Sequence, residues 1–263
     1  MNTAMISFNK SSVLALAKNG KRFDGRKLDE YRGPIEIESS ISKSAEGSVK
    51  VTMGDTVVIA GVKLSLEKPY SDTPDQGGLM INAELSPLSS SRYEPGPPQM
   101  PAIELARVTD RGIRESHVID TKKLCIEKGE KAWFVIVDII SVNDAGNLFD
   151  AAGLAVMAAL RNTTFPKVDD EGKVNYKEHT DEALPIAKDT LSITIRRVGK
   201  NLIVDPTVEE EDASDARLTV SSESDGVISA RQKGGEGTMT IEEVMKAVDL
   251  ALDKANFLRG KLK

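Results

Sequence analysis

Alternating apolar and polar positions predict strands in the first third of the chain. They alternate in "PIEIESSI" at 34–41 and again in "SVKVTMG" at 48–54. The Gly54–Asp55 pair that leads into "TVVIAGVKLSL" is typical of a tight turn, so these runs predict an antiparallel hairpin. A further strand is expected at 77–88, "GGLMINAELSPL", with its end at Pro87.

Helical signals come at the N-terminus, in the middle and at the C-terminus. "SSVLALAKNG" predicts a helix with Ser11 as N-cap and Gly20 as its stop. Helices are also expected at 102–118 and, rich in small apolar residues and therefore buried, at 147–160. Between them, "KKLCIEKG" and "KAWFVIVDIISVN" predict two strands. Thr240 and Glu243 fit a capping box, which predicts the start of the last helix.

The second half repeats this order of strands followed by a helix. Residues 162–185 are polar with little periodicity and are interpreted as a crossover. Four strand runs lie between 190 and 232, before the last helix. Two runs of strands, each followed by a helix, predict an α+β fold of two packed layers of similar plan. We therefore expect a first domain at 1–161, a linker at 162–188 and a second domain at 189–263.

Composition narrows the class of protein. Hydrophobic residues make up 40% of the 263, as in soluble globular proteins, and the chain shows no membrane-length or signal-type apolar run. One cysteine, Cys125, and two histidines exclude a disulfide framework and disfavour a zinc site. These points favour a cytoplasmic protein. The net charge of −6 means that any contact with nucleic acid must use a local basic patch.

One such patch is a stripe of three arginines on the helix predicted at 102–118. Helical spacing places Arg107, Arg111 and Arg114 on one side. One interpretation is a solvated face, neutralised within the helix by the pairs Glu104–Arg107, Asp110–Arg114 and Arg111–Glu115. The other is a phosphate-binding surface, because guanidinium groups suit phosphate oxygens.

Two further segments have the composition of functional sites. The acidic run "DPTVEEEDASDARLTV" at 205–220 could be part of an active site, or its "EEEDASD" could be a solvated loop or one exposed helical turn. The strand-to-helix turn at Gly146 could hold an anion on free backbone N–H groups. One glycine is a weak signal, and the following Asn147, Leu148 and Phe149 bring neither a hydroxyl nor a positive charge.

Several segments resemble the RNase PH-like subunits of the exosome. "RFDGRKLDEYRGPIEIE" at 22–38 is similar to the N-terminal D-G-R-x-x-D-x-R-P segment of that family, with Gly33 before Pro34. The "EPGPP" loop followed by "AIELARVTDRGIRES" resembles the larger, non-catalytic RNase PH-like subunit of the archaeal exosome. The resemblance implies the RNase PH fold, with a ribosomal protein S5 domain 2-like first part and an RNase PH second part.

The chain departs from the active members of this family at two places. The family's Gly-Ser-Arg-type phosphate turn reads Ala145-Gly146-Asn147-Leu148 here, and its catalytic aspartate position holds Arg217. Gly146, Asn147 and Leu148 therefore form a degenerate phosphate turn, and Arg217 marks a degenerate catalytic position. A guanidinium cannot serve as a general acid because it keeps its proton at neutral pH. The resemblance implies no catalytic residue, metal or cofactor in this chain.

The resemblance also implies partners. Three pairs of this chain with an active RNase PH-like subunit would form a hexameric ring that degrades single-stranded RNA from the 3′ end. Inorganic phosphate, with or without Mg²⁺, would be used at the partner's site, and S1/KH-type RNA-binding cap subunits would sit above the ring. Arg107, Arg111 and Arg114 would bind RNA, and no membrane contact is expected. Two alternatives stay open: an active phosphorolytic exoribonuclease with a rearranged site, and a ring scaffold without RNA contact.

Overall fold

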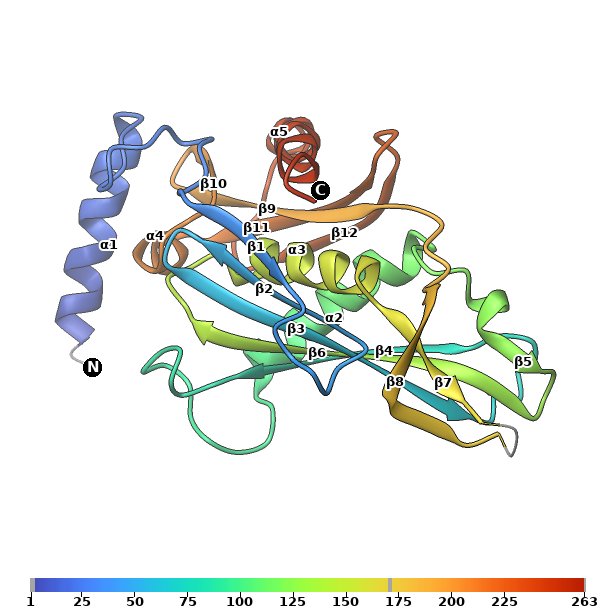
Figure 1. Cartoon of the computed structure of the whole chain (residues 1–263). Helices are drawn as coiled ribbons and strands as arrows, with labels where there is room; N and C mark the ends of the chain where they lie inside the picture. Colours follow the sequence, from blue (N-terminus) through green and yellow to red (C-terminus); the bar gives the residue numbers. More distant parts are fainter. Residues whose placement is uncertain (1–2, 170–171, 263) are drawn as a thin grey trace.

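A six-stranded sheet forms one layer of the protein. The structure, a computed structural model, describes residues 3–169 and 172–262 (Figure 1). The strands follow the order β1 (Ile35–Ser39), β2 (Gly47–Met53), β3 (Thr56–Glu67), β6 (Lys131–Asn143) and β4 (Gly78–Leu85), and β5 (Cys125–Glu127) pairs with β6. β4 runs parallel to β6, and the other neighbours are antiparallel.

The predicted hairpin is present, and its pattern explains the core. β2 and β3 pair from Met53 and Thr56 outward, with Gly54 at a φ of +57° in the turn. Every second residue is buried from Gly47 to Met53 and from Thr56 to Leu64, including Val49, Val51 and Val58. Successive strand residues point to opposite faces, so this alternation turns one face of the sheet toward the core.

A second sheet lies parallel to the first layer, with a helix enclosed between them. Its strand order is β10 (Asn201–Val204), β9 (Thr190–Val198), β11 (Ala216–Glu223) and β12 (Ile228–Gly234). α3 (Leu148–Arg161) packs on β2, β3 and β9, and twelve of its fourteen residues are buried because a sheet covers each side. α5 (Ile241–Arg259) covers the outer face of the second sheet (Figure 1).

α2 (Met100–Glu115) joins the two halves beside α3. It packs on β4 in the first sheet and on β12 in the second. A side chain at Gly112 would lie 2.7 Å from the Ser192 Oγ and 2.9 Å from the Ser221 Oγ. Glycine is therefore needed for the close approach of α2 to the second sheet. The predicted α+β fold of two layered units is confirmed, as is the capping box of Thr240 and Glu243.

Two expectations about local structure were wrong, for the start of α1 and for the strand at 122–129, and a third segment holds strands that were not predicted. α1 spans Thr3–Lys18, so Ser11 lies inside the helix; no proline or glycine precedes it to stop the helix from extending. The segment read as a crossover holds β7 (Thr164–Val168) and β8 (Val174–Ala183), which pair with each other. β8 is mostly exposed, and its pairing with β7 depends on backbone groups. It therefore needs no apolar face, and its sequence shows no periodic pattern of apolar residues. The strand expected at 122–129 is a 3₁₀ turn, Thr121–Leu124, followed by the short β5.

Candidate functional site

The degenerate phosphate turn is packed into the protein. Gly146 has a φ of +97°, and a side chain there would lie 2.4 Å from the Pro206 carbonyl oxygen. Asn147, at the N-cap of α3, adopts a left-handed conformation and is buried. Its Nδ2 donates hydrogen bonds to Asp150 at 3.1 Å and to Asp205 at 3.0 Å. The Asn147 side chain is therefore used in hydrogen bonds inside the protein and does not face a ligand.

A carboxylate of the chain itself bonds to the backbone N–H of Asn147, the N-cap residue of α3. Glu211 comes from α4 (Val208–Ala213), which lies in the acidic run. Its Oε1 accepts a hydrogen bond from the Asn147 backbone N–H at 3.2 Å and one from Arg196 at 2.8 Å. Burial raises the pKa of Glu211, and Arg196 acts against this shift. A helix N-terminal amide and a guanidinium are anion-binding groups, and here an internal anion binds both.

Arg217 lines the same region. Its side chain is 6% exposed and pairs with Glu104 of α2, with 2.5 Å between Nη2 and Oε1. The guanidinium also lies over the Phe149 ring, 4.1 Å from its centre. The neighbouring Asp215 instead pairs with Arg197 at 2.9 Å. The position that the resemblance assigns to a catalytic acid therefore carries the Arg217 guanidinium, which is paired with Glu104.

A hollow of about 200 Å³ remains between these groups. Sequence analysis did not single out Tyr93 and Asp144, which line it and share a 2.5 Å hydrogen bond. Burial and the neighbouring Asp144 carboxylate raise the pKa of Tyr93, so its hydroxyl stays protonated. The charged lining comprises three carboxylates and two guanidinium groups: Glu104, Asp144, Glu211, Arg196 and Arg217. This balance disfavours the entry of inorganic phosphate.

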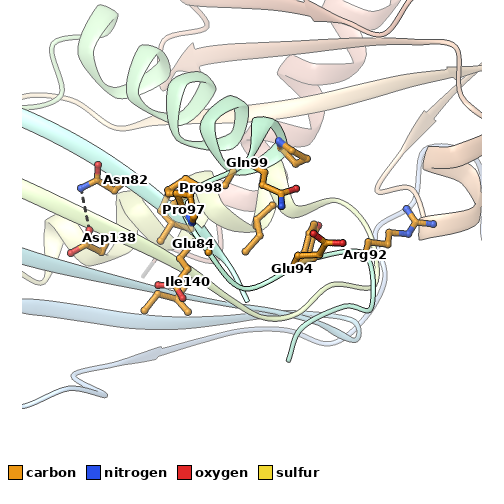
Figure 2. A pocket seen from close by; sticks show the side chains of 16 residues that line it. Asn82, Glu84, Arg92, Glu94, Pro97, Pro98, Gln99, Asp138 and Ile140 are labelled. Carbon is orange, nitrogen blue, oxygen red and sulfur yellow. Dashed lines mark hydrogen bonds between the residues drawn. The ribbon is translucent and has the colours of Figure 1, made fainter. Parts of the chain in front are cut away.

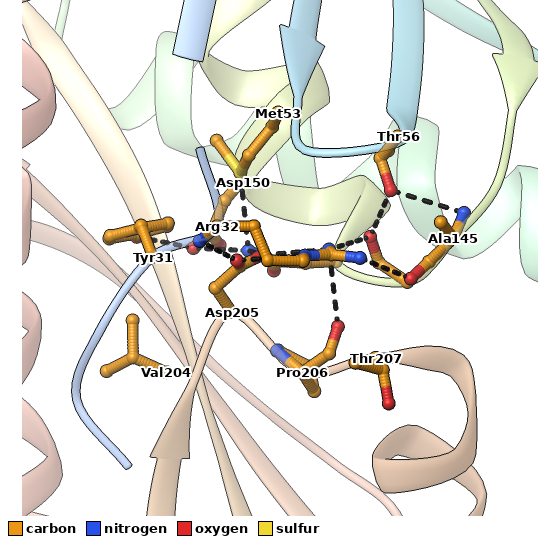
Figure 3. A network of polar contacts seen from close by, with 12 residues as sticks. Tyr31, Arg32, Met53, Thr56, Ala145, Asp150, Val204, Asp205, Pro206 and Thr207 are labelled. Carbon is orange, nitrogen blue, oxygen red and sulfur yellow. Dashed lines mark hydrogen bonds and ion pairs between the residues drawn. The ribbon is translucent and has the colours of Figure 1, made fainter. Parts of the chain in front are cut away.

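Other acids of the 205–217 run are structural (Figure 3). Asp205 is fully buried and accepts from Arg26 and Arg32, each at 2.9 Å, and from Asn147. Arg32 also donates to the carbonyl oxygens of Ala145 and Gly146, which ties the turn to Asp205. Buried carboxylates need cationic partners, so the arginines of the 22–38 segment could have indicated from the sequence that this network exists.

Two more buried acids complete the network. Glu210 pairs with Arg22 at 2.5 Å, and both side chains are shielded from solvent. Asp150 accepts from the Tyr31 hydroxyl at 2.7 Å, the Thr194 N–H at 2.7 Å and Asn147. Burial raises the pKa of Asp150 to about 7, although these donors act against the shift. Within the described ranges, no group of three or more His, Cys, Asp or Glu side chains is arranged to hold a metal ion.

The arginine stripe lies on the outer side of α2. Arg107 is exposed and makes no hydrogen bond or ion pair within the part of the chain that the structure describes. Arg111 is also exposed and donates to Gln232 of β12 at 3.0 Å. Arg114 pairs with Asp110 at 2.7 Å and donates to the Leu79 carbonyl oxygen at 2.8 Å. These residues surround a hollow of about 320 Å³, here called the arginine hollow.

Only one of the three intrahelical pairs expected on α2 is present. Asp110–Arg114 forms, but Glu104 pairs with Arg217 of β11 instead of Arg107, and Arg111 pairs with Gln232 instead of Glu115. Glu104 is therefore paired with Arg217 and does not form the expected ion pair with Arg107. The two direct pairs that the interpretation of a solvated helix face expected for Arg107 and Arg111 are absent, although Glu104 and Glu115 line the same hollow.

Another hollow, of about 610 Å³, lies elsewhere and has the wrong charge for RNA (Figure 2). Glu84, Glu94 and Asp138 line it between β4, β6 and the proline-rich loop. Arg92 also lines this hollow, but its guanidinium is bound to Asp212, with 3.0 Å between Nη1 and Oδ1. This hollow has three carboxylates and one arginine, whereas the arginine hollow has three arginines against Glu104, Asp110 and Glu115. The arginine hollow is therefore the better candidate for RNA.

None of the described helices has the length and apolar character needed to cross a membrane.

Comparisons with known proteins agree with the fold. Models of the 3′ exoribonuclease family match at residues 30–166 for domain 1 and 190–254 for domain 2. "Exosome complex component Rrp42" of Thermococcus onnurineus is 43% identical over 261 residues, covering 98% of this chain and 95% of the relative. The protein of the same name from Sulfurisphaera tokodaii is 44% identical over 257 residues, covering 97% of this chain and 93% of the relative.

Solved structures give the same result. A chain of the "archaeoglobus fulgidus exosome with RNA bound to the active site" is 42% identical with a TM-score of 0.91, covering 99% of this chain and 100% of that one. A chain of an "Archaeal exosome core" is 38% identical with a TM-score of 0.87, covering 98% of each. The chain belongs to the RNase PH, or 3′ exoribonuclease, family. Within that family it is similar over nearly its full length to archaeal exosome components named Rrp42, which confirms the resemblance found in the sequence.

Proposed function

We propose that this chain is a non-catalytic subunit of an archaeal-type exosome core. It pairs with an active RNase PH-like subunit in a hexameric ring, presents the arginine stripe to single-stranded RNA and helps to shape the partner's site. Inorganic phosphate is used at that partner's site for 3′→5′ phosphorolysis. The relatives named as exosome components, and the similar chain in an exosome with bound RNA, support this assignment.

The observation that carries the non-catalytic assignment is the position of Glu211. Its carboxylate bonds to the Asn147 N–H and to Arg196, the groups that could otherwise hold an anion at the start of α3. Arg217 supplies a cation where the family places a catalytic acid. A phosphate would have to displace Glu211 from these groups, and Arg217 cannot act as a general acid because a guanidinium keeps its proton at neutral pH.

We expect the isolated chain to show no phosphate-dependent degradation of RNA. Purified chain would be incubated with a single-stranded oligonucleotide and inorganic phosphate, and nucleoside diphosphates would be measured. The same chain reconstituted with its active RNase PH-like partner is the positive control. Robust release of nucleoside diphosphates from the partner-free preparation would support the alternative of a rearranged active site.

Restoring the lost acid by Arg217→Asp should not create activity. The substitution would leave Glu211 on the α3 N-terminus and would place a fourth carboxylate in the hollow lined by Glu104, Asp144 and Glu211. Phosphoryl transfer depends mainly on electrostatic positioning of the phosphate, which these charges oppose. The same product assay on partner-free protein tests this, and turnover by the variant would show that the turn at 145–148 can still bind phosphate.

A further inference from the structure

Arg111 is held by a residue from the other half of the chain. Its Nη1 donates to the Oε1 of Gln232 at 3.0 Å. Arg111 lies in the segment that matches family domain 1, and Gln232 lies in the segment that matches domain 2. Both residues line the arginine hollow.

The orientation of Gln232 follows from the strand on which it lies. Gln232 is paired in register with Thr219 of β11, and Thr219 is 1% exposed. Directly opposed residues share a face of the sheet, so Gln232 lies on the face that carries Thr219, and α2 packs on this sheet with Gly112 against Ser192 and Ser221. The Nε2 of Gln232 donates to the Lys233 carbonyl oxygen at 3.4 Å, which leaves Oε1 free to accept from Arg111.

The side chain of Gln232 is a neutral amide, so it leaves the positive charge of Arg111 intact. A carboxylate at this position would pair with Arg111 and cancel its positive potential, as Glu104 does for Arg217. An amide oxygen accepts one guanidinium N–H and leaves the full charge and the other donors of Arg111 available. Fixing the guanidinium in advance also reduces the entropy lost when it binds a phosphate.

We propose that Gln232 is a positioning residue that holds the Arg111 guanidinium at the arginine hollow, ready for an RNA phosphate. The RNA-binding surface is then built by both domains. This inference rests on the proposed function, because it requires that Arg111 binds RNA in the assembled ring.

The test uses the ring reconstituted with the active subunit, and measures affinity for single-stranded RNA against salt concentration. Gln232→Glu should reduce the slope of log affinity against log salt by about 0.7, and lower the affinity roughly fivefold at 0.1 M salt, as the loss of one phosphate contact would. Gln232→Ala should weaken binding about twofold to tenfold with an unchanged slope, because Arg111 keeps its charge and loses only its orientation.

Two controls separate positioning from other roles. Gln99→Glu adds the same charge at the N-cap of α2, about 12 Å along the helix from Arg107, and should leave the slope unchanged. In an Arg111→Ala background, Gln232→Ala should have no further effect on affinity. Thermal midpoint and ring mass should be unaltered in every variant.

Each contrary result has a distinct meaning. If Arg111→Ala reduces the slope and Gln232→Glu does not, the positioning role is wrong while the proposed function stands. If Gln232→Ala weakens binding equally without Arg111, Gln232 contacts RNA directly and the positioning role is again wrong. If Arg111→Ala itself changes nothing in an intact ring, both the RNA role of the stripe and this inference are overturned.

Discussion

The ring that carries Arg107→Ala together with Arg111→Ala should bind single-stranded RNA much more weakly than the unaltered ring. Each phosphate contact that is lost should lower the salt slope of log affinity by about 0.7, so two lost contacts should lower it by roughly 1.4 per protomer engaged. Counter-ion release alone then implies an affinity roughly 25-fold lower at 0.1 M salt. Both arginines are exposed on α2, so assembly and folding should be unaffected.

The measurement is RNA affinity over a series of salt concentrations, together with the rate of degradation. The effect should be similar for RNAs of different sequence, because phosphate contacts position a strand without reading its bases. Degradation by the partner's site should also slow, because that site acts on a strand held in place.

Arg114→Ala is the matched control for the double variant. Arg114 is already paired with Asp110 and bonded to the Leu79 carbonyl oxygen, so its removal should change the salt slope less than the removal of Arg107 or Arg111. An unchanged slope in an intact double-variant ring would favour the alternative of a scaffold without RNA contact.

Glu210→Ala should destabilise the chain by about 3–5 kcal/mol, because it leaves the Arg22 guanidinium buried without its counter-charge. Both side chains are almost completely shielded, and the pair joins the N-terminal segment to α4. Glu210 also caps α4 by accepting from the Thr207 N–H at 2.9 Å. The loss of this acceptor adds to the effect.

Urea unfolding, followed by circular dichroism, measures this difference. Glu209→Ala is the control: Glu209 is the preceding residue on the same helix but is exposed, so its loss should cost at most about 1 kcal/mol through the helix dipole. Equal unfolding midpoints for the two variants would show that the Arg22–Glu210 pair contributes no more than a surface charge.

Much of the fold followed from local patterns. The β2–β3 hairpin, the buried helix α3 and the capped helix α5 each depend on residues close together in the chain, so turn chemistry, periodicity and caps were sufficient to predict them. The polar hairpin of β7 and β8 was missed because its pairing depends on backbone groups, which leave no pattern of side chains. The N-terminal extension of α1 was missed because Ser11 is an acceptable N-cap residue that the fold does not use as one.

The sequence by itself determined which residues stand at 145–148 and at 217, and these residues are the basis for proposing a non-catalytic subunit. Only the tertiary structure decided what those positions do instead. Glu211 reaches Asn147 across 64 residues of sequence, Arg217 reaches Glu104 across 113, and Arg111 reaches Gln232 across 121. Charge pairing depends on distance in space, and local spacing predicted different partners for Glu104 and Arg111. Packing α2 and α4 against the second sheet brought these charges together. It left Arg107 without an ion pair in the part of the chain that the structure describes, and it placed Glu211 at the Asn147 N–H.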